Sequence, residues 1–131
     1  MTRKDKELLL NDICARIPYG VKGINTYNVL SSPGTWETEF NLKFAIIYRI
    51  EKFGWRPYLF PMSSMTEEQR KEYEDALTYH DYVEGGWTIA KSFDEYIVPY
   101  WFVDFCNKNH FDYRGLIDKG LAIDATNLNI Y

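Results

Sequence analysis

The last part of the chain, HFDYRGLIDKGLAIDATNLNIY, combines residue types that could do chemistry. His110 stands two residues before Asp112, and Arg114 follows two residues later. A histidine beside an aspartate can hold a proton or a metal ion, but zinc needs three or four ligands and no third ligand stands at a recognisable spacing. We therefore interpret Asp112 as the N-cap of a short helix over residues 113–118, and His110 as a side chain that bonds a nearby carbonyl. The cluster predicts neither a metal site nor a cofactor.

A cysteine nucleophile would need a histidine within hydrogen-bond reach. Cys106 stands four residues before His110, so the two would share a face if a helix continued through them. The aromatic residues around Cys106 instead predict a buried, inert thiol. We interpret Cys14 and Cys106 as two small buried hydrophobic side chains with free thiols. No catalytic residue is assigned, and a small hydrolase or transferase that uses His110 with Asp112 or Cys106 is the alternative hypothesis.

Other catalytic signatures are missing from the chain. Its serines lie in turn or cap contexts without a G-x-S-x-G motif. Its glycines lack the spacing of a P-loop or of a dinucleotide-binding turn. The sequence therefore favours binding over catalysis.

Aromatic residues are frequent, with 4 Trp, 11 Tyr and 8 Phe in 131 residues. Tyr82 and Trp87 flank Glu84-Gly85-Gly86, a sequence that predicts a loop. Aromatic side chains exposed in loops often dominate the energy of protein–protein contacts. The same residues could form a lid over an aromatic core. Tyr82 and Trp87 are the candidate partner-binding residues.

Charge is unevenly divided along the chain. Residues 1–66 contain nine Lys or Arg against six Asp or Glu (+3), and residues 67–131 contain six against thirteen (−7), which gives the net charge of −4. Nucleic-acid binding is disfavoured, because the acidic half would repel a phosphate backbone. A basic protein partner is permitted, and an acidic mimic of nucleic acid is a weaker hypothesis. We expect no membrane span and no signal peptide, which predicts a cytoplasmic protein.

Local signals predict three main helices. The first covers residues 3–15, with Thr2 and Asp5 in a weak capping box. Its apolar face at helical spacing comprises Leu9, Leu10, Ile13, Cys14 and Ile17. The second starts at a capping box formed by Thr66 and Gln69. The third starts at Pro99 and covers PYWFVDFCNKN, because proline suits the first position of a helix.

The segment between the first two helices predicts a sheet. Large apolar residues alternate from Phe40 to Ile50, and a period of two favours a strand with one buried face. A helical interpretation through Phe40, Phe44 and Ile47 leaves Leu42 and Ile46 off its stripe. Further strands are predicted over residues 20–22, 24–30 and 55–59. We expect one α+β domain over residues 1–131, in which a small antiparallel sheet or partly closed barrel of three to five strands packs with the N-terminal helix and two or three others.

Three stretches, LLLNDICARIPYGVK, RPYLFPMSSMTEEQRKEY and NKNHFDYRGLIDKGLAIDA, resemble a family of small uncharacterised proteins met in Bacteroides genomes, often in phage-like or mobile-element surroundings. The resemblance covers under half of the chain, in the family's order. It transfers no catalytic residue, because the family has no established activity. It implies a host or phage accessory protein that acts in the bacterial cytoplasm. Our leading hypothesis is a non-enzymatic protein-interaction protein with a protein partner.

Overall fold

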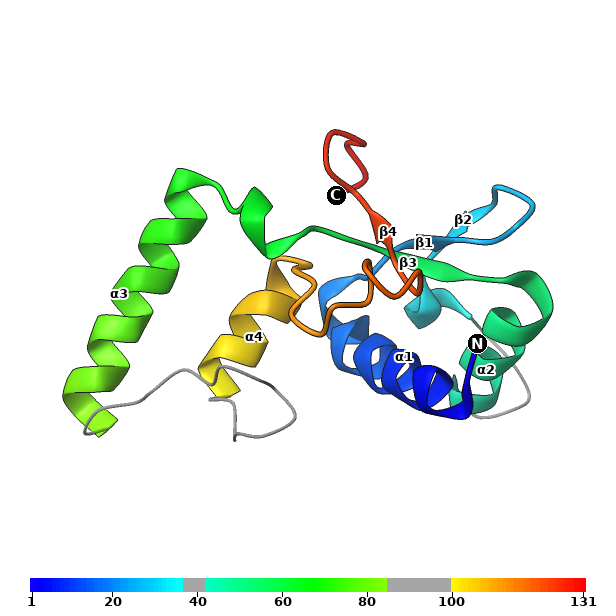
Figure 1. The fold of residues 1–131 in the computed structure, drawn as a ribbon, viewed down its shortest axis with the longest axis horizontal. Coiled ribbons are helices and arrows are strands. Elements are labelled where there is room, and N and C mark those ends of the chain that lie inside the picture. Colours follow the sequence, from blue (N-terminus) through cyan, green and yellow to red (C-terminus); the bar gives the residue numbers. More distant parts are fainter. Residues whose placement is uncertain (37–41, 85–99) are drawn as a thin grey trace.

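The computed structural model describes residues 1–36, 42–84 and 100–131, and the side chains of all of these except 77–84 and 100 (Figure 1). The fold is α+β, as the sequence predicts, with an N-terminal helix. The described helices are α1 (Arg3–Arg16), α2 (Leu42–Phe53), α3 (Glu67–Glu84) and α4 (Tyr100–Lys108). The described strands are β1 (Gly23–Ile24), β2 (Leu30–Ser31), β3 (Arg56–Leu59) and β4 (Ile123–Asp124). Three short 3-10 turns complete the order, η1 (Ile17–Tyr19), η2 (Pro33–Thr35) and η3 (Met62–Ser64).

The predicted capping boxes start two of the helices. At α1, the Asp5 backbone N–H donates to Thr2 Oγ1 and the Thr2 N–H donates to Asp5 Oδ2. At α3, Thr66 and Gln69 exchange the equivalent pair of bonds at 2.8 and 3.1 Å. Each of these hydrogen bonds joins residues that are three positions apart, so the capping boxes form without any distant contact and can be predicted from the sequence.

The strand predicted over Phe40–Ile50 is wrong in the described part of that run, because residues from Leu42 onward form α2. The buried side chains of α2 are Ala45, Ile46 and Ile50, which join the residues of α1 in one hydrophobic core. Phe44 and Tyr48 are 62% and 55% exposed. The alternation of large apolar residues predicted a strand incorrectly, because Phe44 and Tyr48 lie on the exposed face of a helix rather than on the buried face of a strand.

The sheet has the order β2-β1-β3-β4 and is mixed and open, so the predicted all-antiparallel sheet is corrected. β1 pairs antiparallel with β2 and β3, whereas β3 and β4 are parallel. The strand predicted over residues 55–59 is confirmed as β3. The strand predicted over 24–30 is interrupted by a turn, in which Asn25 Oδ1 accepts the N–H groups of Tyr27 and Val29 and Asn28 has a φ of 62°.

Glycine is required at position 23 on β1. A Cβ atom there would lie 2.2 Å from the Trp55 ring and 2.5 Å from the Arg56 carbonyl. Trp55 is 1% exposed and cannot move aside without opening the core. The pairing of β1 with β3 therefore depends on Gly23.

Two hydrophobic clusters fill the interior. One joins α1 and α2 to Trp55, Leu59, Leu116 and Leu121. The other is aromatic and surrounds α4, with contributions from α3 and η3; its buried members are Trp101, Phe102, Phe105, Cys106, Phe111 and Tyr113. In Figure 1, α3 and α4 lie at one end of the molecule and α2 at the other, with α1 and the sheet between them.

The C-terminal segment crosses the sheet and returns to β3. Residues 113–118 form turns rather than the predicted short helix. Asp112 is therefore not a helix N-cap; its carboxylate closes the turn by accepting the N–H groups of Leu116 and Ile117. Gly120 has the predicted left-handed φ, 72°. No helix in the described ranges combines the length and apolar character needed to cross a bilayer.

Candidate functional site

The side chains of His110, Asp112 and Arg114 have separate partners, so the predicted polar cluster does not form one site. Both oxygens of Asp112 are used by the backbone N–H groups of Leu116 and Ile117, at 2.8 and 2.9 Å. Arg114 Nε lies 3.8 Å from Asp12 Oδ1 on α1. The helix that Asp112 was predicted to cap is absent, but its carboxylate accepts two backbone hydrogen bonds within the turn.

His110 is held by stacking. Its ring lies 3.6 Å from the ring of Tyr131, with 10° between the planes. It is 9% exposed, and its Nδ1 has no hydrogen-bond partner in the described part of the chain. The predicted side-chain bond to a carbonyl is therefore wrong at Nδ1; instead the His110 carbonyl accepts the N–H of Phe60 at 2.8 Å. The residue adopts a left-handed φ of 60° at this point.

The surroundings of His110 keep its ring neutral. Burial, with smaller contributions from the charges of Arg16 and Lys22, lowers the pKa of His110 to about 4. A protonated imidazole is therefore disfavoured at neutral pH. The ring packs against the C-terminal segment rather than facing a carboxylate.

Cys106 is fully buried in the aromatic cluster, as predicted. Its Sγ lies 4.0 Å from Met62 Sδ, and burial raises the pKa of the thiol to about 12. The thiolate needed for nucleophilic attack is thus strongly disfavoured. Cys14 is exposed, so the prediction that it is buried is wrong. Leu9, Leu10 and Ile13 of the predicted stripe are buried, but the buried face continues through Asp12 and Arg16 rather than through Cys14.

A buried ion pair on α1 is the feature that the sequence interpretation missed. Arg16 donates from Nε to Asp12 Oδ2 at 2.8 Å and from Nη2 to Asp12 Oδ1 at 3.2 Å, and both side chains are 0% exposed. Burial raises the pKa of Asp12, although Arg16 and Arg114 act in the opposite direction. The signal was the spacing Leu9, Asp12, Ile13, Arg16, which follows one helix face.

The side chains of the two predicted partner-binding residues, Tyr82 and Trp87, lie outside the part of the chain that the structure describes. Tyr82 belongs to α3, which continues to Glu84, so its backbone is helical rather than in the predicted loop. Trp87 lies outside the described residues. Their role as contact residues remains a prediction.

Tyr131 anchors the end of the described chain. Its hydroxyl accepts the Lys22 N–H at 2.8 Å and lies 2.8 Å from the Tyr58 carbonyl, to which it donates. Lys22 Nζ donates to the Ile130 carbonyl and lies 5.7 Å from the centre of the Tyr131 ring. Burial raises the pKa of this phenol to about 12. The hydroxyl is therefore a structural hydrogen-bonding group.

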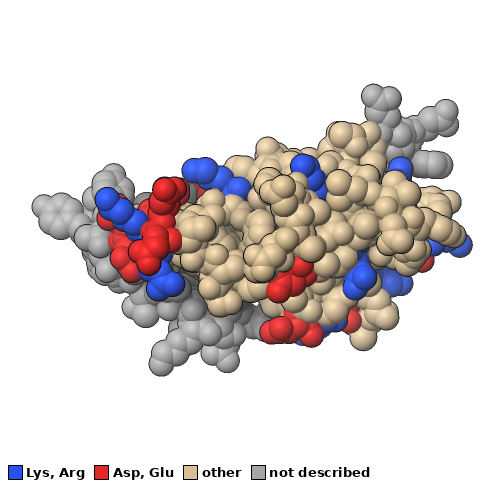
Figure 2. Space-filling model, turned by 90° about the horizontal axis from the view of Figure 1, so that it is seen from above, with Lys and Arg blue, Asp and Glu red and all other residues tan. Residues whose placement is uncertain are grey.

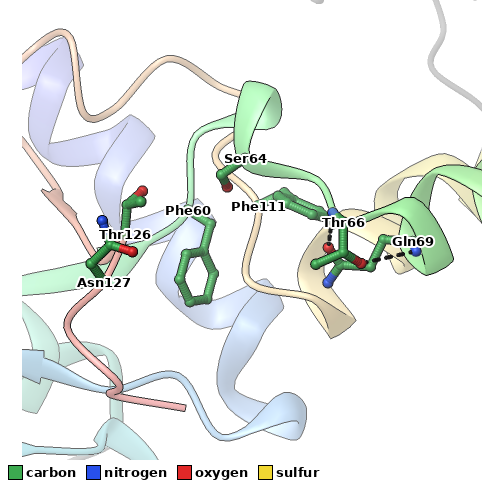
Figure 3. Close-up of a pocket in the computed structure, with 7 residues that line it drawn as sticks. All are labelled: Phe60, Ser64, Thr66, Gln69, Phe111, Thr126 and Asn127. Carbon is green, nitrogen blue, oxygen red and sulfur yellow. Dashed lines mark hydrogen bonds between the residues drawn. The ribbon is translucent and has the colours of Figure 1, made fainter.

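A pocket of about 240 Å³ opens between the end of β3, the start of α3 and the C-terminal segment (Figure 3). Its lining is two phenyl rings and five uncharged polar residues: Phe60, Phe111, Ser64, Thr66, Gln69, Thr126 and Asn127. The polar groups of Thr66 and Gln69 bond one another, and Ser64 Oγ donates to the Pro61 carbonyl at 2.7 Å. Small-molecule and cofactor sites usually measure about 300–1,000 Å³. This pocket suits one side chain better than a cofactor.

Exposed aromatic side chains form a second feature at the α2 end of the molecule. Tyr27 and Tyr48 both contact Phe53, with ring centres 6.2 and 5.6 Å apart. Phe44 lies one helical turn from Tyr48 on α2 and is exposed like it. We call Tyr27, Phe44, Tyr48 and Phe53 the aromatic surface. Exposed cations lie beside these residues in the sequence: Lys43, Lys52 and Arg56.

The described residues contain no group of three or more His, Cys, Asp or Glu side chains placed to hold a metal ion. The geometry offers an exposed aromatic surface and a small uncharged pocket, whereas the side chains of His110, Asp112 and Tyr131 are used in internal contacts. Comparisons of the chain with protein-family models, with curated proteins and with solved structures find no match.

Proposed function

We propose that the protein is a non-enzymatic protein-interaction protein whose contact site is the aromatic surface. The observation that supports this most directly is that large aromatic rings are exposed to water side by side, with Tyr27 71% and Tyr48 55% exposed. Monomeric soluble proteins rarely leave such groups contiguous unless a partner covers them. Tyrosine is also among the residues that contribute most to binding energy at protein interfaces.

The contacts of the candidate catalytic groups agree with this proposal. A general base must reach its proton, and a nucleophile must be deprotonated. The Asp112 carboxylate accepts two backbone N–H groups of a turn, the Cys106 thiol is buried, and the His110 ring is stacked on Tyr131. These arrangements do not favour the hydrolase or transferase alternative.

The proposed setting is a bacterial cytoplasm, where the protein would act as an accessory of a phage or mobile element. That setting rests on the resemblance of three sequence stretches alone. The basic residues beside the aromatic surface favour an acidic or uncharged partner there.

Site-specific photocrosslinking in producing cells tests the contact site. A benzophenone amino acid replaces Tyr27 or Tyr48 in separate experiments, and Tyr19, which is 37% exposed on η1, serves as the matched control. We expect discrete protein adducts from positions 27 and 48 and none from position 19. Equal adducts from all three positions, or none from any, would contradict the proposal. Probes at Tyr82 and Trp87 test the alternative contact residues in the same way.

A further inference from the structure

We propose that the pocket receives the Tyr27 side chain of a second copy of this chain, so that the aromatic surface of one copy docks on the pocket of another. The inference rests on the proposed function, because Tyr27 belongs to the aromatic surface. It adds the identity of one partner and assigns a role to a cavity that the proposed function does not use.

The pocket has the size and lining for one aromatic ring. Its volume of about 240 Å³ exceeds the roughly 150 Å³ at which an apolar cavity accepts benzene. Phe60 and Phe111 supply ring surface for stacked or edge contacts. A buried phenol also needs a hydrogen-bond partner. Asn127 offers one, because its side-chain amide makes no hydrogen bond within the described residues.

Tyr27 is presented in a fixed conformation. Asn25 Oδ1 accepts the Tyr27 N–H at 2.8 Å and the Val29 N–H at 3.0 Å. The Asn28 N–H donates to the Asn25 carbonyl at 3.1 Å, which closes the turn. Tyr27 is the most exposed large hydrophobic side chain among the described residues, at 71%. A preorganised turn loses little conformational entropy on binding.

The charges near the two surfaces are opposite. Lys43, Lys52 and Arg56 lie beside the aromatic surface with one exposed acid, Glu51, whereas Glu67 and Glu68 follow Thr66 at the edge of the pocket. The first ten residues of α3 contain five acidic and two basic side chains. Figure 2 shows acidic side chains, with some Lys and Arg beside them, at the α3 end and a largely uncharged band across the middle of that face. This complementarity favours a second copy, because the chain itself supplies both an aromatic surface with basic neighbours and an uncharged pocket with acidic neighbours.

The two docking surfaces are different parts of the chain, so the contact joins unlike surfaces. Each added copy leaves one aromatic surface and one pocket open unless the assembly closes into a ring. Wild-type protein should therefore associate as its concentration rises. A variant that lacks one of the two surfaces should remain at the mass of one chain.

Sedimentation equilibrium over a concentration series tests this with two single variants. Tyr27→Ala removes the aromatic ring that would enter the pocket, and Thr126→Lys places a cation and a larger side chain at the edge of the pocket. Both positions are exposed, so the fold is expected to persist. Matched controls are Tyr19→Ala, and Thr35→Lys, whose hydroxyl likewise bonds within a short turn. We expect each test variant to weaken self-association by about tenfold or more, and each control to match wild type.

Mixing the two variants gives the sharper result. The Tyr27→Ala variant keeps its pocket and the Thr126→Lys variant keeps its Tyr27 ring. The ring of the second can therefore enter the pocket of the first, and an equal mixture should recover association. In an open arrangement this recovery stops at two chains. Wild type that stays at the mass of a single chain, 15.6 kDa, at every concentration would overturn the inference, as would association unaffected by both variants. Adducts from position 27 to other proteins, with wild type monomeric, would refute the self-contact while leaving the proposed function intact.

Discussion

Arg16 Nη2 donates a 2.5 Å hydrogen bond to the carbonyl oxygen of Phe111, a residue 95 positions further along the chain. The same guanidinium pairs with Asp12, so one buried cation joins α1 to the C-terminal segment beside the aromatic cluster. The Tyr113 ring lies 5.4 Å from this guanidinium. The contact fixes how the two hydrophobic clusters lie against each other. It also explains why a charged pair occupies the buried face of a helix.

Loss of Arg16 should destabilise the protein severely. Arg16→Met leaves Asp12 buried without its main partner, and breaking such a pair costs about 3–5 kcal/mol. The double variant Asp12→Leu with Arg16→Met should cost less, because no fully buried charge is then left unpaired. The Phe111 carbonyl loses one hydrogen bond, at about 1–3 kcal/mol, and Arg114, which is partly exposed, loses its 3.8 Å contact with Asp12. Urea unfolding measures both changes. Arg3→Met is the control, because Arg3 belongs to an exposed pair with Glu7. A double variant as unstable as the single one would contradict this account.

The buried, neutral ring of His110 should make stability depend on pH. Its pKa is lowered to about 4 in the folded protein, against roughly 6.5 in an unfolded chain. The unfolded state therefore binds the extra proton between these values, so stability is full above pH 6.5 and falls as the pH drops toward 4. The contribution is on the order of 3 kcal/mol at most. Urea unfolding of wild type and of His110→Asn between pH 5 and 7 measures it, because asparagine tolerates the left-handed φ. Equal pH slopes for the two proteins would contradict the prediction.

Gly23→Ala should disrupt the pairing of β1 with β3. The added methyl group would overlap the buried Trp55 ring, and overpacking a core typically costs about 1–3 kcal/mol, or more where the neighbour cannot move. Thermal unfolding measures the loss. Gly34→Ala is the matched control, because its nearest neighbour, Ile17 Cγ2, lies 3.7 Å away. A similar melting temperature for both variants would show that Trp55 can move aside.

The two cysteines should differ in reactivity. Cys14 is exposed, whereas burial raises the pKa of Cys106 to about 12. A thiol-specific chromogenic reagent should therefore modify a single thiol in the folded protein and both after denaturation. Cys14→Ser should abolish the reaction of the folded protein. Rapid modification of the folded Cys14→Ser variant would mean that the aromatic cluster opens around Cys106.

Local signals were sufficient to predict part of this fold. The capping boxes at Thr2 and Thr66 and the left-handed Gly120 were predicted correctly, because each depends on residues only a few positions apart. The aromatic helix, described from Tyr100 to Lys108, and the strand over residues 55–59 were also predicted, whereas the helix's predicted start at Pro99 lies outside the described residues. Burial of Cys106 followed from its aromatic neighbours, but exposure of Cys14 did not follow from the apolar stripe.

Periodicity alone could not assign residues 42–50. Phe44 and Tyr48 are large and apolar and fall in the period-two pattern that predicts the buried face of a strand, yet both are exposed. The buried residues, Ala45, Ile46 and Ile50, follow helical spacing. The choice between the two interpretations depends on which face α1 covers. That information belongs to packing rather than to the local sequence.

The amino-acid sequence by itself determined where α1 and α3 begin, the left-handed turn at Gly120, the α+β class, and the charge difference between the halves of the chain. The tertiary structure alone decided the parallel pairing of β3 with β4, the bond from Arg16 to Phe111, and the pocket built from three separate segments. The physical reason is the sequence separation of the groups that interact. A cap or turn is stabilised by groups a few residues apart, whereas a buried ion pair or a pocket depends on which distant segments exclude water together.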